Sequence, residues 1–159
     1  MKKLKTLIIT ALCLVSVFAL VGCGCSMSKT AISADDFKNK VETQGYIVHD
    51  DTDHQKQLTN VPDAISKVYV GQNATLNKIE FWQLSEDKYA NSMYNNNLPT
   101  YDSNTGIKTN VSVGNSDKFT IKKDGKYTVL ERVGNTFVLA QASDTDEDAL
   151  DKTLESLGY

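Results

Sequence analysis

The chain has 159 residues, of which 40% are hydrophobic, and it carries 17 basic and 20 acidic side chains. Residues 1–22, which have the pattern of an export signal, hold three of the lysines; without them the chain has 14 basic and 20 acidic residues and a net charge of −6. This negative charge argues against binding to nucleic acid or along anionic lipid headgroups. No cysteine follows Cys25, so a domain beyond it has no internal disulfide and must be stabilised by packing.

The N-terminus has the three parts of an export signal. A cationic head of three lysines precedes an apolar run over residues 7–21, which ends at the small residue Gly22 beside Cys23. As an uncleaved transmembrane helix, about 16 apolar residues would span only ~24 Å of a ~30 Å hydrocarbon core. An ordinary cleaved signal would leave the cysteine without a role, and cleavage before Cys25 would follow a poorer recognition sequence.

The stretch Leu20-Val21-Gly22-Cys23 resembles the lipobox of bacterial lipoproteins. The resemblance implies that residues 1–22 are removed and that Cys23 is acylated, with palmitate or a similar fatty acid. Two or more acyl chains would hold the protein on the extracytoplasmic side of the cell membrane. Residues 23–32 then read as a flexible tether, and residues 33–159 as a single globular domain.

The domain is predicted to begin with a helix. Ser33 suits the N-cap, Asp36 stands at the capping-box position, and Gly45 suits the left-handed residue that ends a helix. A short strand is expected over residues 46–48, followed by a polar connector over residues 49–63.

Two strands are predicted next, over residues 65–70 and 76–84, with a turn at Gly71-Gln72-Asn73. A second helix is expected from residue 86 to about residue 96, where a run of asparagines and Pro99 should end it.

The clearest pattern lies in residues 108–141. Three turn dipeptides spaced ten residues apart divide this stretch into four strands of a meander: Gly114-Asn115, Asp124-Gly125 and Gly134-Asn135. A last helix is predicted from Asp144, with a stripe of buried leucines. The predicted fold class is therefore α+β, an antiparallel sheet with a C-terminal four-strand meander and about three packed helices. The outer strand of the meander can pair with another molecule if its edge is open.

Several further motifs accompany the lipobox: Ser-Ala-Asp-Asp-Phe at residues 33–37, Ile-Glu-Phe at 79–81, Asp-Gly-Lys-Tyr at 124–127 and a terminal Leu-Gly-Tyr. Together they resemble small uncharacterised lipoproteins of Gram-positive anaerobic bacteria. The resemblance implies a bacterial, surface-anchored protein and carries over no catalytic residue.

Two acidic segments are candidate metal sites. His49 and His54, the only histidines, bracket Asp51 and Asp53, and imidazole and carboxylate groups are metal ligands, although the segment also fits a solvated acidic loop. The Asp-x-Asp-x-Asp pattern at residues 144–148 is similar to the start of a calcium loop, but alanine stands where that loop needs glycine. Acidic residues at a helix N-terminus explain it better.

Aromatic side chains offer a second kind of site. Tyr69, Trp82 and Tyr101 can line a groove that stacks on sugars or peptides, although single strand aromatics usually belong to the core. No nucleophile elbow, zinc-protease motif or phosphate loop is present, and the plentiful carboxylates leave only a paired-acid glycosidase open. The sequence favours a non-enzymatic domain without a cofactor, which binds a protein or envelope component. The alternative is a small-ligand or metal-binding module.

Overall fold

The computed structural model describes residues 28–102 and 105–159. Within them the elements in chain order are α1 (Ala34–Thr43), β1 (Ile47–Asp50), α2 (Thr52–Gln57), the 3₁₀ turn η1 (Pro62–Ala64), β2 (Ile65–Gln72), β3 (Lys78–Leu84), α3 (Asp87–Tyr101), β4 (Ile107–Val113), β5 (Ser116–Lys123), β6 (Lys126–Val133), β7 (Thr136–Ser143), the 3₁₀ turn η2 (Asp144–Asp146) and α4 (Glu147–Leu157).

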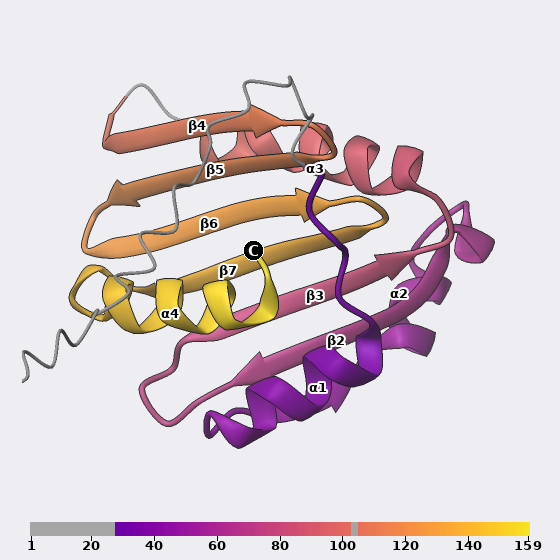
Figure 1. Cartoon of the computed structure of the whole chain (residues 1–159), viewed down its shortest axis with the longest axis horizontal. Coiled ribbons are helices and arrows are strands. Elements are labelled where there is room, and N and C mark those ends of the chain that lie inside the picture. The colour runs from indigo at the N-terminus through magenta and orange to yellow at the C-terminus, as the bar shows by residue number, and fades with distance from the viewer. Residues whose placement is uncertain (1–27, 103–104) are drawn as a thin grey trace, which may run out of the picture.

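The strands form one seven-stranded antiparallel sheet in the order β1-β2-β3-β7-β6-β5-β4 (Figure 1). The α+β class and the C-terminal meander are confirmed, and all three predicted turn dipeptides connect neighbouring strands. Asp124 and Gly125 have φ angles of 52° and 73°, as a primed hairpin turn requires. Beyond the meander, β7 pairs with β3, and this pairing joins the two halves of the chain into one sheet.

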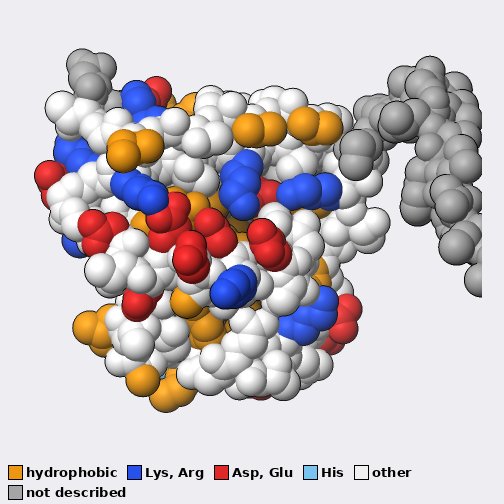
Figure 2. All heavy atoms as spheres, turned by 60° about the vertical axis from the view of Figure 1, so that its left-hand side comes forward, with side chains coloured by type: hydrophobic (Ala, Val, Ile, Leu, Met, Phe, Trp, Pro, Cys, Tyr) orange, Lys and Arg blue, Asp and Glu red, His pale blue; other side chains and the backbone are white. Residues whose placement is uncertain are grey.

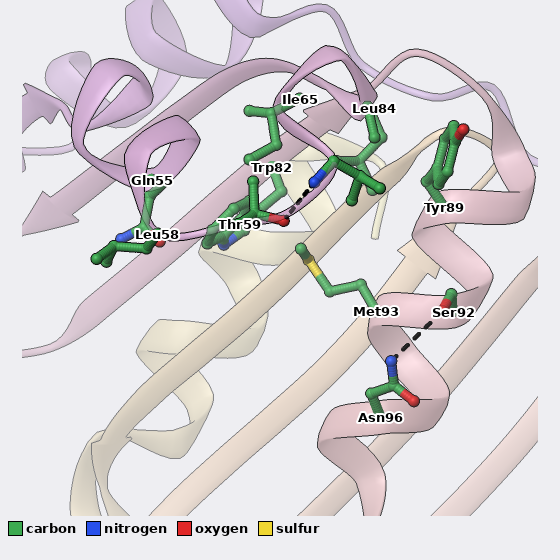
Figure 3. Close-up of a pocket in the computed structure, with 12 residues that line it drawn as sticks. Gln55, Leu58, Thr59, Ile65, Trp82, Leu84, Tyr89, Ser92, Met93 and Asn96 are labelled. Carbon is green, nitrogen blue, oxygen red and sulfur yellow. Dashed lines mark hydrogen bonds between the residues drawn. The ribbon is translucent and has the colours of Figure 1, made fainter.

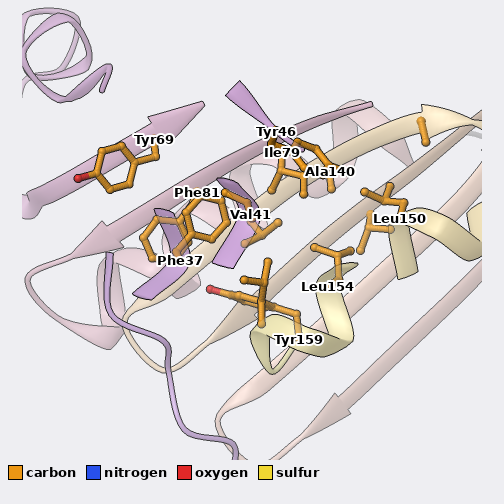
Figure 4. Close-up of a cluster of buried hydrophobic side chains, with 14 of the residues drawn as sticks. Phe37, Val41, Tyr46, Tyr69, Ile79, Phe81, Ala140, Leu150, Leu154 and Tyr159 are labelled. Carbon is orange, nitrogen blue, oxygen red and sulfur yellow. The ribbon is translucent and has the colours of Figure 1, made fainter. Parts of the chain in front are cut away.

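Helices cover both faces of the sheet (Figure 1). We call the side that carries α1 and α4 the α1/α4 face, and the opposite side the α3 face. On the α1/α4 face the ring of Phe37 stacks on that of Phe81 with centroids 4.3 Å apart (Figure 4). The leucine stripe of α4 is buried beside them, as its spacing predicts: Leu150, Leu154 and Leu157.

The two faces divide the apolar residues by strand alternation. Phe81 packs under α1 and its neighbour Trp82 packs toward α3, while Val129 and Leu130 divide in the same way. Because a strand directs successive side chains to opposite faces, adjacent apolar residues require cover on both sides.

The predicted start of the first helix is confirmed in atomic detail. The backbone N–H of Asp36 donates to Ser33 Oγ at 3.2 Å, and that hydroxyl donates to Asp36 Oδ2 at 2.7 Å. Gly45 follows the helix with a φ of 84°, the left-handed conformation expected of it.

Three local predictions were wrong. The segment predicted as a polar connector contains α2 and η1, and α2 brings the α-helices of the described residues to four. The second helix passes through Pro99 to Tyr101, because Leu98 and Tyr101 pack on the α3 face and tertiary contact outweighs the cost of proline. The last helix begins at Glu147, since residues 144–146 form the separate turn η2.

The described part of the predicted tether, residues 28–32, packs against the domain instead of extending freely. It crosses the α1/α4 face and then leads into α1 (Figure 1). The backbone N–H of Lys29 donates to Asn115 Oδ1 at 2.9 Å, and its side chain donates to Glu131 Oε1 at 2.7 Å. Ala31 and Ile32 pack against the core. The lipobox and Cys23 lie outside the described residues.

Candidate functional site

A groove opens on the α3 face between α3 and the segment that runs from α2 to β2 (Figure 3). Its volume is about 270 Å³. β3 forms the floor, α3 forms one wall, and residues 55–65 form the other. The lining residues are Gln55, Leu58, Thr59, Val61, Ala64, Ile65, Trp82, Leu84, Tyr89, Ser92, Met93 and Asn96.

Trp82 holds the central place in this groove. Strand alternation directs it away from Phe81 and toward α3, where it packs with Met93. These two side chains belong to both apolar clusters of the α3 face, one centred on Phe137 and the other on Leu84. The floor of the groove is therefore held by core packing, while part of the indole stays accessible.

The outer wall carries large apolar side chains that solvent reaches. Leu58 is 69% exposed and Val61 is 54% exposed, although both lie beside buried apolar residues of the groove. The Oγ1 atom of Thr59 accepts a hydrogen bond from the Val61 N–H at 3.2 Å, which shapes this wall. Trp, Tyr and Met are residue types enriched in protein interfaces, so the groove resembles a contact surface in composition.

Polar groups at the groove are neutral. Among the residues that the structure describes, no Asp, Glu, His, Lys, Arg or Cys lines it. The side-chain amide of Asn96 donates to Ser92 Oγ at 3.4 Å, and the amide of Gln55 donates to Asp51 Oδ2 at 2.7 Å outside the groove. The site can therefore offer apolar contact, aromatic stacking and neutral hydrogen bonds, but no charge.

The structure separates the three aromatic residues that the sequence groups together. Tyr69 lies on the α1/α4 face, where it is 6% exposed and its ring stacks near that of Phe37. Tyr101 shares the α3 face with Trp82 but lines another hollow, of about 310 Å³, beside Lys123 and other polar residues. Burial raises the pKa of Tyr101. Of the three, only Trp82 lies in the groove.

The sequence missed most of the groove. The predicted polar connector over residues 49–63 contains Leu58 and Val61, and two large apolar residues just before Pro62 are the sequence signal that points to this wall. Tyr89 and Met93 lie on the helix predicted from residue 86; they pack on the Leu84 cluster while lining the groove.

The histidine and aspartate segment forms no metal-ligand cluster. His49 lies in β1 opposite Val70, whereas His54 lies in α2 with its Nδ1 atom 3.2 Å from Asp51 Oδ1. Asp53 belongs to the first turn of α2. Across residues 28–102 and 105–159, no group of three or more His, Cys, Asp or Glu side chains is placed to hold a metal ion.

The neighbouring Asp50 instead has a structural role. Its carboxylate accepts hydrogen bonds from Lys67 Nζ at 2.6 Å and from the N–H of Thr52 at 3.0 Å, at the start of α2. The Lys67 hydrogen bond, followed by those from Thr52, lowers the pKa of Asp50 to about 2. The acidic run at residues 144–148 likewise occupies η2 and the first turn of α4, where negative charge is favourable.

Within the described residues, no helix is both long enough and apolar enough to cross a membrane. No protein-family model matches the chain, and neither a curated protein nor a solved structure matches it.

Proposed function

We propose that the protein is a lipid-anchored extracytoplasmic binding domain without enzymatic activity. Its groove would receive uncharged, apolar side chains from a partner protein of the cell envelope. The observation that carries this proposal is the charge-free lining around Trp82, in a chain of which 23% of residues are charged.

The dimensions of the groove favour a protein partner over a small molecule. Its volume of about 270 Å³ is close to the lower end of the ~300–1,000 Å³ range of typical small-molecule pockets. Its outer wall carries the solvent-exposed apolar side chains of Leu58 and Val61. A surface of this kind can bury a few apolar side chains of a partner around an aromatic centre, as binding hot spots do.

The chemistry of the lining supports binding rather than catalysis. Ser92 is a hydroxyl without a neighbouring base, since Asn96 is an amide and cannot accept its proton at neutral pH. General acid–base catalysis needs a titratable group near neutral pH, and the described residues of the lining supply no carboxylate, imidazole or ammonium.

The proposed anchor is compatible with an accessible groove. From Cys23 to Lys29, six residues reach at most about 20 Å when fully extended, so the domain would stay near the bilayer. Residues 28–32 leave from the α1/α4 face, while the groove lies on the α3 face. Growth with tritiated palmitate tests the anchor: the label should be incorporated and should be lost in a Cys23→Ser variant.

Site-specific photo-cross-linking on intact cells tests the binding site. A benzophenone side chain at Val61 should trap one recurring protein, whereas the same group at Ile47, which is 68% exposed on β1, should not. Leu58→Glu should abolish the trapping, because it places a charge on the apolar wall. The matched control is Leu76→Glu, at a residue 73% exposed in the β2–β3 connection. Equal trapping at both positions, or trapping unaffected by Leu58→Glu, would contradict the proposal.

Intrinsic fluorescence then tests contact with the groove itself. Trp82 is the only tryptophan of the chain, so its emission reports on this site without labelling. A peptide that carries the trapped segment should shift the emission with saturable dependence on concentration. If the trapped segment leaves the emission unchanged and a small apolar molecule shifts it, the groove is a small-ligand site instead.

A further inference from the structure

The outer strand β4 is an open sheet edge. It is the last strand in the sheet order of the described residues, and all seven of its residues are exposed. It pairs with β5 over its whole length without a register shift. It carries one charged residue, Lys108, and no proline. Long, regular edges of this kind are the ones that proteins usually protect, because they can pair with another strand.

The other edge of the sheet is much shorter. β1 has four residues and leads directly into α2, which packs beside β2. Its sequence ends in the charged residue Asp50. By length, β4 is therefore the more suitable edge for pairing.

The backbone of β4 is arranged for pairing. A two-residue hairpin turn is closed by a hydrogen-bonded pair, here Val113 and Ser116. Since hydrogen-bonding direction alternates along a strand, Ser112 and Asn110 direct their N–H and C=O groups away from β5. Those groups point toward the open side of the sheet.

The side chains of β4 on the α1/α4 face are all β-branched: Ile107, Thr109, Val111 and Val113. Ile107 is 74% exposed, and Val111 and Val113 are 48% exposed each. α1 lies over β1, β2 and β3 and α4 lies over β7, so neither helix covers the β4 end of the sheet (Figure 1). Figure 2 shows apolar side chains along the upper rim of the molecule, at the level of β4, above a band of basic side chains.

We infer that β4 pairs antiparallel with β4 of a second copy of this chain, around a twofold axis at Asn110. This is the single antiparallel register that pairs all seven residues. It places Ile107 opposite Val113 of the second copy and Thr109 opposite its Val111, so that β-branched side chains meet on one face. It places Lys108 opposite Ser112 of the second copy, so the strand's one charge meets a hydroxyl and no like charge.

The charges near the edge permit this approach. Lys108 Nζ lies 2.5 Å from Asp102 Oδ1, Lys118 Nζ lies 3.0 Å from Glu131 Oε2, and Lys122 forms an ion pair with Glu147. Because each of these lysines has a carboxylate partner within its own copy, repulsion between the two edges is reduced.

The geometry of this pairing is also compatible with attachment of both copies to one membrane; this argument depends on the proposed lipid anchor. A twofold axis that relates two antiparallel edge strands stands normal to the sheet. Both α1/α4 faces, and with them both copies of residues 28–32, then lie on the same side. Confinement to one membrane raises the effective concentration of the two copies, which helps an interface as small as one strand pair. Both grooves stay open on the opposite face.

Disulfide trapping in membranes tests the inference, with the full chain in a Cys25→Ser background. Asn110→Cys places the thiol on the axis, and mild oxidation should give covalent dimers at least tenfold faster than for Ile107→Cys. The two Ile107 positions would lie about 20 Å apart, at ~3.4 Å per residue. The parent without an added cysteine sets the background. The double variant Ile107→Cys/Val113→Cys should form covalent dimers, because the proposed register places residue 107 opposite residue 113 of the second copy. Equal rates for the two single variants would overturn the inference.

A charge on the apolar row provides the second arm. Val111→Lys in the Asn110→Cys protein should reduce dimer formation at least tenfold without changing the melting temperature, since residue 111 is exposed. Unchanged cross-linking in this variant would refute the proposed face and register.

Discussion

Replacing Lys29 with methionine tests how the N-terminal segment is held to the domain. Glu131 is fully buried, with Lys29 Nζ at 2.7 Å from Oε1 and Lys118 Nζ at 3.0 Å from Oε2. The contact with Lys118 lacks hydrogen-bond geometry, so Oε2 has no hydrogen-bond partner among the described residues. Lys29 is therefore the side chain that both neutralises Glu131 and hydrogen-bonds to it.

The expected cost follows from this geometry. Removing one partner of a fully buried ion pair typically costs about 3–5 kcal/mol, and a hydrogen bond to a charged group contributes about 1.5–3 kcal/mol. Lys118 still neutralises part of the charge, and Lys29 is 43% exposed, so water can replace part of the lost bond. We expect Lys29→Met to lower the free energy of unfolding by about 1.5–2.5 kcal/mol.

Urea unfolding at pH 7, followed by the fluorescence of Trp82, measures this loss. The matched control is Lys38→Met: Lys38 has the same 43% exposure, but its partner Glu42 is 44% exposed and 3.9 Å away. That variant should lose less than about 0.5 kcal/mol. In a Glu131→Gln background, Lys29→Met should cost much less, because no buried charge is left behind. Equal losses for the two lysine variants would refute the reasoning.

Three further predictions concern the fold. Phe37→Ala should cost about 3–5 kcal/mol in urea unfolding, because the ring is fully buried and stacked on Phe81. Gly125→Ala should cost about 1–2 kcal/mol in the same assay: its φ is +73° and no atom lies within 4 Å of the added methyl, so left-handed strain alone acts. Asp50→Asn should be less stable than the parent at pH 7, with the difference closing as the pH falls from about 4 toward 2. The folded-state pKa of Asp50 is lowered to about 2, so its ionised form stabilises the fold above the unfolded-state pKa of ~3.9. Exposure of the carboxylate keeps this difference below about 1 kcal/mol.

Each of these has a contrary outcome. A cost below 1 kcal/mol for Phe37→Ala would mean that α1 contributes little to the core. A neutral Gly125→Ala would mean that the turn changes conformation without cost. If the stability difference between Asp50→Asn and the parent does not vary with pH, the hydrogen bond from Lys67 to the ionised carboxylate is not its cause.

Local signals account for the parts of the fold that were predicted correctly. The hairpin dipeptides at residues 114–115, 124–125 and 134–135 act through backbone conformations within four residues, so they locate the meander without knowledge of the rest of the chain. The Ser33 cap and Gly45 at the end of α1 depend on equally short distances. These signals were sufficient for the α+β class.

The groove depends on strand register and on contacts between distant segments, which no local sequence pattern contains. Whether Tyr69 shares a face with Trp82 is decided by the β2–β3 register, which pairs Tyr69 with Phe81. The groove combines residues 55–65, 82–84 and 89–96, and its outer wall comes from a segment with no regular apolar spacing.

By itself, then, the sequence determined the order of the seven strands, three of the four α-helices of the described residues, and the meander. Tertiary structure alone decided that α3 continues through Pro99, that β7 joins β3, and that Trp82 faces an open groove. The physical reason is the range of the interactions. Caps and turns are decided by neighbours along the chain, whereas register, edge exposure and burial depend on which distant segments pack together.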